Sequence, residues 1–151
     1  MFKRILLATD GSKLSARGVK QAIKLAKPLR ARITAVHVVE SYHQRLTDED
    51  DGFAIPVIST FKKDFEERAA ARAGKILSPV AAAASKSGVK CDTVAVTGDR
   101  PFEAIIKQAR KSKCDLIVMA SHGRSGIRGF LLGSETAKVL THSTIPVLVV
   151  R

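Results

Sequence analysis

The sequence contains few of the residues on which several common functions depend. Of its 151 residues none is Trp, one is Tyr, and aromatic residues make up 5%. Proteins that bind single-stranded nucleic acid usually stack bases on aromatic side chains, so this composition argues against that class. The two cysteines, Cys91 and Cys114, form no C-x-x-C motif and indicate neither a zinc site nor a redox centre.

Long hydrophobic runs are also missing. The strongest apolar stretches, residues 115–120 and 145–150, have the length of strands, and neither approaches the roughly 20 residues that cross a bilayer. The apolar run after Lys3 and Arg4 ends at Asp10, which is too early for a secretion signal. We therefore expect a cytoplasmic protein that does not contact a membrane.

Charge is plentiful and unbalanced. The chain has 26 Lys and Arg against 14 Asp and Glu, a formal net charge of +12. Such a surplus favours anionic partners, namely nucleotides, nucleic acid or an acidic protein surface, and charge alone does not choose among them. With 45% hydrophobic residues, the chain is expected to fold throughout as one domain covering residues 1–151.

Strand and helix patterns alternate along the chain. Strands are predicted at residues 3–9, 32–39, 89–97, 115–120 and 146–150, and helices at residues 14–29, 61–84, from Pro101 onward, and 134–142. The long second helix is expected to bury one face, made of Phe61, Phe65, Ala69, Arg72, Ile76, Val80 and Ala84. Regular alternation predicts an α/β fold with a parallel sheet and helices on both faces. We expect this sheet to be doubly wound, open and five-stranded, with the order 3-2-1-4-5.

Two loops of such a sheet are candidates for a binding site. In doubly wound sheets, ligands bind beside the carboxyl ends of the strands, where the winding reverses. The loop after the first strand holds Ala8 to Ser12, and the loop after the fourth runs from Ala120 to Ser134. The second loop contains Gly123, Gly126, Gly129 and Gly133, with Arg124 and Arg128 among them.

This glycine-containing loop favours phosphate. Backbone N–H groups of glycines can surround an anion, and the helix that begins at Gly133-Ser134 presents further free N–H groups and a hydroxyl. Glu135, in the first turn, would repel a phosphate if it pointed inward. The alternative reading is a surface loop followed by an ordinary serine cap.

Three stretches together resemble a known family. Gly123, Gly133 and Ser134 fit the second half of the pattern G-x2-G-x9-G-[S/T], and Ala120 stands at its first glycine. The opening Ile5 to Ser12 and the ending Ile145 to Val150 are similar as well. Over its whole length the chain resembles the universal stress protein family, whose nucleotide-binding members carry this pattern after the fourth strand.

The resemblance implies a ligand and a site. Asp10 would contact the ribose or adenine region, the backbone at Val38 would meet adenine, and Gly123 to Ser134 would hold the phosphates of ATP or a related adenine nucleotide, with Mg²⁺ on a triphosphate. It also implies a homodimer joined through the last strand, Val147 to Val150. The expected site residues are Ala8, Thr9, Asp10, Val38, Met119, Ala120, His122, Gly123, Arg124, Gly126, Gly133 and Ser134.

Several interpretations remain open from the sequence alone. No G-x-S-x-G or G-x4-G-K-[S/T] motif is present, and the adjacent Ser121 and His122 make a poor nucleophile and base, so we expect a sensor or regulatory module with at most slow ATP hydrolysis. Asp10 could hold a metal on the triphosphate or cap the next helix. His122 could touch a phosphate or merely pack. The alternative function is a stress protein that binds no nucleotide and acts through acidic proteins or nucleic acid on its basic surface.

Overall fold

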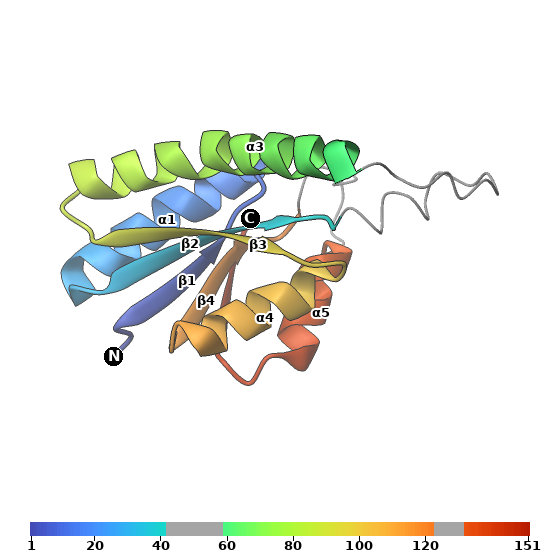
Figure 1. Ribbon diagram of the computed structural model, residues 1–151. Helices are drawn as coiled ribbons and strands as arrows, with labels where there is room; N and C mark the ends of the chain where they lie inside the picture. The colour runs from blue at the N-terminus through green and yellow to red at the C-terminus, as the bar shows by residue number, and fades with distance from the viewer. Residues whose placement is uncertain (42–58, 123–131) are drawn as a thin grey trace.

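The computed structural model describes residues 1–41, 59–122 and 132–151. The part of the chain it describes forms strands and helices in alternation (Figure 1). Their bounds are β1 Arg4–Ala8, α1 Lys13–Leu29, β2 Arg32–Val39, α3 Ser59–Lys86, β3 Cys91–Thr97, α4 Pro101–Lys111, β4 Leu116–Ala120, α5 Ser134–His142 and β5 Val147–Val150.

The strands form one parallel sheet of five, in the order β3-β2-β1-β4-β5. This order confirms the prediction. From the central strand β1 the chain winds outward through β2 and β3, then returns to the other side of β1 for β4 and β5. Leu7 of β1 lies between Ala35 of β2 and Val118 of β4, so the switch in winding falls between β1 and β4.

Two hydrophobic cores sandwich the sheet. Side chains alternate along each strand, so Leu7 packs under α1 and α3 while Leu6 packs under α4 and α5. Figure 1 shows the corresponding layers, with α1 and α3 on one face of the sheet and α4 and α5 on the other. The strand β4 is buried from end to end, as its continuous apolar run predicts for a strand covered on both faces.

Element bounds agree with the sequence patterns to within two residues at the strand ends. β2 and α5 have the predicted bounds, whereas β1, β3, β4 and β5 are each shorter than predicted. The extra residues lie just outside the paired part of each strand, although several still make backbone hydrogen bonds to the neighbouring strand. Thr9 is one example, because its N–H still donates to Val36 O at 2.9 Å although the chain has begun to turn.

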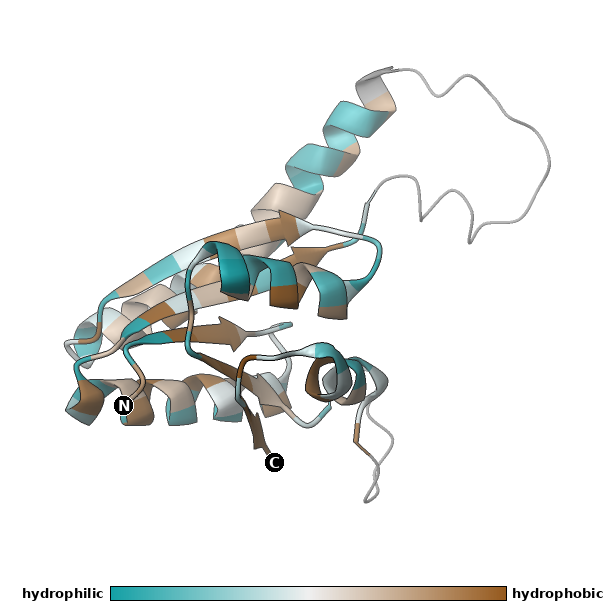
Figure 2. Ribbon diagram, turned by 90° about the horizontal axis from the view of Figure 1, so that it is seen from below, coloured by the Kyte–Doolittle hydropathy of each residue, from teal (hydrophilic) through white to brown (hydrophobic). Residues whose placement is uncertain are grey.

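The helix α3 departs from the expected burial pattern. Ala73, Leu77, Val80 and Ala84 are buried, but Phe61, at the start of the predicted apolar face, is 63% exposed. Figure 2 shows why, since the first part of α3 runs past the edge of the sheet. Ion pairs at i,i+4 spacing, such as Lys62–Glu66 and Asp64–Arg68, accompany this outer part.

None of the described helices has both the length and the apolarity that a membrane crossing requires.

Candidate functional site

The turn after β1 is held by its own side chains. Ser12 is the N-cap of α1, and its Oγ accepts a hydrogen bond from Ser15 N at 3.1 Å. Asp10 Oδ1 accepts from Ser12 N at 3.0 Å, and the hydroxyl of the buried Thr9 lies 3.0 Å from Ser15 Oγ. Gly11 has φ +76°, a conformation that side chains disfavour. The Asp10 carboxylate therefore stabilises this turn, while Ser12 rather than Asp10 caps the helix.

The end of β4 is fastened to the start of α5. Ser121 N donates to Val150 O of the neighbouring strand at 2.8 Å, and Thr136 Oγ1 donates to Ala120 O at 3.0 Å. Gly133 N donates to Ser121 O at 2.8 Å. A Cβ on Gly133 would lie 3.0 Å from Ser121 O and 3.2 Å from His122 Cα. Glycine is favoured here because a side chain would press against the backbone of the neighbouring segment.

The first turn of α5 is open, in the sense that no side chain caps its N–H groups. Its N-cap is Gly133, which has no side chain to accept a hydrogen bond. The first bond inside the helix is Ala137 N to Gly133 O at 2.9 Å. Within the described part of the chain, the N–H groups of Ser134, Glu135 and Thr136 have no acceptor. Three donors and the positive end of the helix dipole thus meet at one point, the arrangement that binds anions.

Glu135 does not occupy this open turn with its carboxylate. Its Oε2 accepts from Phe102 N at 2.9 Å, and its Oε1 pairs with Lys138 Nζ at 2.9 Å. The helix α4 needs this acceptor, because its own N-cap, Arg100, makes no capping hydrogen bond. The repulsion that Glu135 would exert on a phosphate is therefore reduced, since its charge faces α4 and Lys138.

The strand ends bring the two turns to one edge of the sheet. The strands β1 and β4 are neighbours, so Thr9 and Ser121 leave the sheet side by side at their carboxyl ends. Ala8 lies opposite Val36, which places Val38 two residues beyond the end of β1. His37 fixes this overhang, with its Nδ1 2.9 Å from Thr9 O. The edge of β2 at Val38 thus faces the space that follows Thr9.

The predicted residues of the strands themselves are packed. Ala8, Val38 and Met119 contribute side chains to the core beneath α4 and α5, so only their backbones face the edge of the sheet. Ala120, by alternation with Val118, points to the α1 side, where α1 approaches closely through Gly18. The methyl group at the first glycine position of the motif is therefore buried against α1.

The remaining predicted residues divide into two groups. His122 is half-buried at the end of β4, with its Nδ1 3.1 Å from Ser121 Oγ, and Ser134 is exposed at the start of α5. Gly123, Arg124 and Gly126 lie outside the described residues, as do Gly129 and Arg128.

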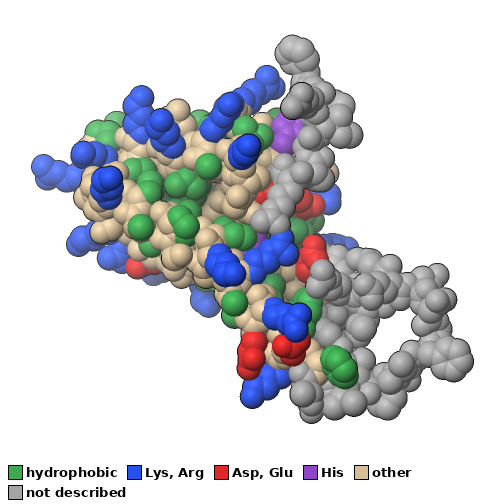
Figure 3. All heavy atoms as spheres, turned by 90° about the horizontal axis from the view of Figure 1, so that it is seen from above, with side chains coloured by type: hydrophobic (Ala, Val, Ile, Leu, Met, Phe, Trp, Pro, Cys, Tyr) green, Lys and Arg blue, Asp and Glu red, His purple; other side chains and the backbone are tan. Residues whose placement is uncertain are grey.

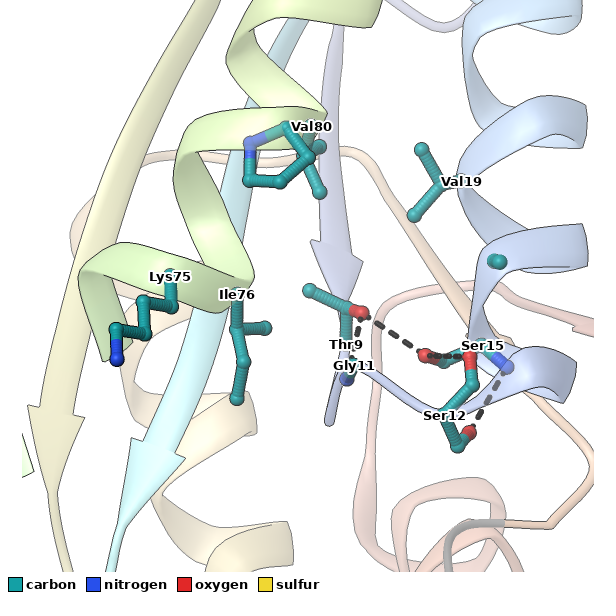
Figure 4. Close-up of a pocket in the computed structure, with 10 residues that line it drawn as sticks. Thr9, Gly11, Ser12, Ser15, Val19, Lys75, Ile76 and Val80 are labelled. Carbon is teal, nitrogen blue, oxygen red and sulfur yellow. Dashed lines mark hydrogen bonds between the residues drawn. The ribbon is translucent and has the colours of Figure 1, made fainter. Parts of the chain in front are cut away.

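A separate pocket of about 250 Å³ lies between α1 and α3 (Figure 4). Its walls are apolar, with Val19 on one side and Ile76 and Val80 on the other, and hydroxyls of Thr9 and Ser15 lie at its base. Of the predicted site residues that the structure describes, Thr9 alone lines it. The pocket is on the opposite face of the sheet from α5, so it is not the expected phosphate position.

Other chemistries find no support in the described residues. No group of three His, Cys, Asp or Glu in this part of the chain could hold a metal ion. Cys91 and Cys114 are free, and burial raises the pKa of both thiols, which keeps them protonated and poorly nucleophilic. His142 packs against Phe102 with ring centroids 5.1 Å apart.

Sequence reasoning missed the residues that position the site. Thr136 and Ser121 are buried and connect β4 to α5 and β5, and His37 connects β2 to the first turn. A threonine two residues after the motif serine is the available signal for the first of these, because its hydroxyl can reach back to the end of the preceding strand.

Known proteins resemble the chain along its whole length. Universal stress protein YxiE of Bacillus subtilis is 32% identical over 151 residues, covering 100% of both chains. The solved structure of protein MJ0577 of Methanocaldococcus jannaschii superposes with a TM-score of 0.82 at 27% identity, covering 99% of this chain and 96% of that one. A universal stress protein solved in complex with cAMP gives a TM-score of 0.71 at 28% identity, covering 99% and 97%.

The family model described as the universal stress protein family matches residues 1–151. The strand order, the motif around Gly133 and the full-length relatives agree with this match. The chain therefore belongs to the universal stress protein family.

Proposed function

We propose that this universal stress protein binds an adenine nucleotide, ATP in particular, and acts as a cytoplasmic sensor or regulatory module with at most slow hydrolysis. One observation carries the proposal: the open first turn of α5 lies at the same sheet edge as the turn after β1. Its three N–H groups, which have no acceptor among the residues that the structure describes, suit a phosphate, and the chain has a net charge of +12.

The other contacts are assigned by position. The phosphates lie against Ser134 and the segment before it, the ribose lies near Asp10, and adenine meets the overhanging backbone of β2 at Val38. His122 stands at the end of β4 between these regions. A Mg²⁺ ion would arrive with the triphosphate and take ligands from it. The relative in complex with cAMP, at 28% identity, supports an adenine nucleotide as the ligand class.

The test is a thermal shift titration with ATP, AMP and GTP. A ligand at one hundred times its Kd stabilises the fold by about 2.7 kcal/mol. For a domain of this size that raises the melting temperature by roughly 5–10 °C. We expect this shift with ATP, a smaller one with AMP, and the smallest with GTP, because recognition of adenine lies in the β2 backbone.

A pair of variants makes the titration specific. Ser134→Ala removes the exposed hydroxyl beside the open turn and should weaken ATP binding about tenfold, since a hydrogen bond to a charged group contributes roughly 1.5 kcal/mol. Ser85→Ala, at an exposed position on α3, is the matched control and should bind as wild type. A wild-type protein whose melting temperature no nucleotide raises would contradict the proposal.

The last strand supports a proposed homodimer. β5 is an edge strand of the sheet, and Leu148 on it is 39% exposed. An apolar edge of this kind favours pairing with a second copy. Leu148→Lys should convert a dimer to a monomer in size-exclusion chromatography with light scattering. Leu140→Lys, at a comparably exposed leucine on α5, should leave the mass unchanged. A wild-type monomer at high concentration would contradict the dimer.

A further inference from the structure

One face of α1 is lined with positive charge. Its basic residues follow one another at steps of four, three, four and three, which places all five within an arc of about 80° at 3.6 residues per turn. All five side chains are exposed. The residues that α1 buries lie on the opposite side, including Gly18, Ala22 and Ala26. We call this set the basic stripe: Lys13, Arg17, Lys20, Lys24 and Lys27.

The stripe has no acidic counterpart. No Asp or Glu occurs from residue 11 to residue 39. None of its five members takes part in an ion pair with any residue that the structure describes. Cations on α3 and α5 and at the N-cap of α4 do, as in Lys62–Glu66, Lys138–Glu135 and Arg100–Glu103. Figure 3 shows the molecule from the side of α1 and α3, where Lys and Arg side chains far outnumber Asp and Glu.

Such an arrangement is unfavourable in the isolated protein. Like charges three or four residues apart on a helix repel each other, and the stripe repeats this contact four times. The stripe extends over about 21 Å, from a rise of 1.5 Å for each of 14 steps. A straight, rigid row of cations of this length is complementary to a linear polyanion, which would relieve the repulsion by binding along the row.

We infer that the basic stripe of α1 binds the phosphate backbone of duplex DNA without regard to sequence. Four of the five members are Lys, whose compact charges contact phosphates individually rather than reading base edges as bidentate Arg does. This mode needs no aromatic stacking, so the shortage of aromatic residues, which argues against single-stranded ligands, does not oppose it.

The surroundings of the stripe favour DNA over other polyanions. Among the described residues, the exposed large hydrophobic side chains are Met1, Phe61, Leu140 and Leu148, and none of them is on α1. A protein interface usually has an apolar centre, and a helix that lies on a membrane usually inserts apolar side chains. A purely cationic, linear surface has neither, which leaves backbone electrostatics as the recognition that it can perform.

The experiment measures fluorescence anisotropy of a labelled 20-base-pair DNA duplex of mixed sequence, titrated with the full chain at 50–200 mM salt. We expect a Kd on the order of 10 μM at the lowest salt and a plot of log K against log [salt] with a slope of about −4.5 for five contacts. The variant Arg17→Gln/Lys20→Gln/Lys24→Gln should bind at least tenfold more weakly, with the slope reduced to about −2.

The control removes the same charge elsewhere. Lys107→Gln/Arg110→Gln/Lys111→Gln takes three exposed cations from α4 and should keep the wild-type slope. Circular dichroism checks that both variants fold. Equal losses in the two variants would overturn the inference, because they would show a response to net charge alone. Absence of duplex binding at 50 mM salt, or tighter binding to single strands, to vesicles with anionic lipid or to a poly-glutamate peptide, would overturn it as well.

Discussion

The helices that follow β1 and β4 begin at the same edge of the sheet, yet their first turns differ. In α1, Ser12 accepts the N–H of Ser15, and Asp10 accepts that of Ser12. In α5, Gly133 offers no side chain, and three N–H groups have no acceptor among the described residues. The side-chain cap of α1 is thus supplied by the protein itself, whereas we propose that a ligand caps α5.

The first turn of α4 differs again, because its side-chain acceptor comes from another helix. Arg100 makes no capping hydrogen bond, and the carboxylate of Glu135, from the first turn of α5, accepts Phe102 N instead. The residue best placed to compete with a phosphate at α5 is thus engaged by its neighbour. Among the described residues, α1 and α4 each have a side-chain acceptor in the first turn and α5 has none, which supports the proposed binding of an anion at α5.

The largest effect is expected where the backbones touch. Gly133→Val would place a Cβ 3.0 Å from Ser121 O, so α5 must shift away from β4. We expect a loss of about 1–3 kcal/mol in the free energy of unfolding and no ATP binding that calorimetry can detect. Gly74→Val, whose Cβ meets nothing within 4 Å, serves as the control. If the Gly133→Val variant bound ATP as tightly as wild type, the proposed role of the first turn of α5 in binding would be contradicted.

The next effect concerns the hydroxyl that connects α5 to β4. Thr136→Val keeps the shape of the side chain but leaves Ala120 O without its donor in a buried position, at a cost of about 1–2 kcal/mol. Because the first turn is less firmly placed, ATP should bind several-fold more weakly by calorimetry. Thr141→Val, which removes an exposed hydroxyl later in α5, should change the melting temperature little; an equal change would contradict a special role for Thr136.

The first turn of α1, which has a side-chain cap, should respond in stability alone. Ser12→Ala removes the cap of α1 and is expected to cost about 1 kcal/mol in urea denaturation. The increase in melting temperature that ATP produces should stay the same, since the cap does not face the phosphates. If Ser12→Ala left stability unchanged but abolished ATP binding, the first turn of α1 would be a binding element, which contradicts the role assigned to it.

The smallest effect tests where Glu135 acts. Glu135→Gln retains an acceptor for Phe102 N but removes the negative charge near α4, which should cost about 0.5 kcal/mol in stability. The same change removes a like charge from the neighbourhood of the phosphates. ATP affinity measured by calorimetry should therefore rise, by no more than about threefold at moderate salt. A fall in affinity would mean that the carboxylate itself contacts the ligand.

The sequence predicts the arrangement of this fold better than its details. Alternating apolar runs suffice for a parallel sheet with helices on both faces and for the bounds of β2 and α5, and the expected order 3-2-1-4-5 is the one found. They do not predict that the part of α3 before Ala73 extends past the sheet. Helical periodicity shows which face of a helix is apolar, but not where the sheet under that face ends. The sequence also does not show where the Glu135 side chain points. That depends on the first turn of α4, which lacks a side-chain cap of its own and is distant in sequence.

The most direct measurement is a ¹⁵N–¹H NMR titration with ATP. We expect the amide signals of Ser134, Glu135 and Thr136 to shift in a saturable manner, whereas that of Ser15, already bonded to Ser12 Oγ, should stay in place. Saturable ATP binding that leaves the three α5 amides unmoved would contradict the claim that this helix start is completed by the nucleotide.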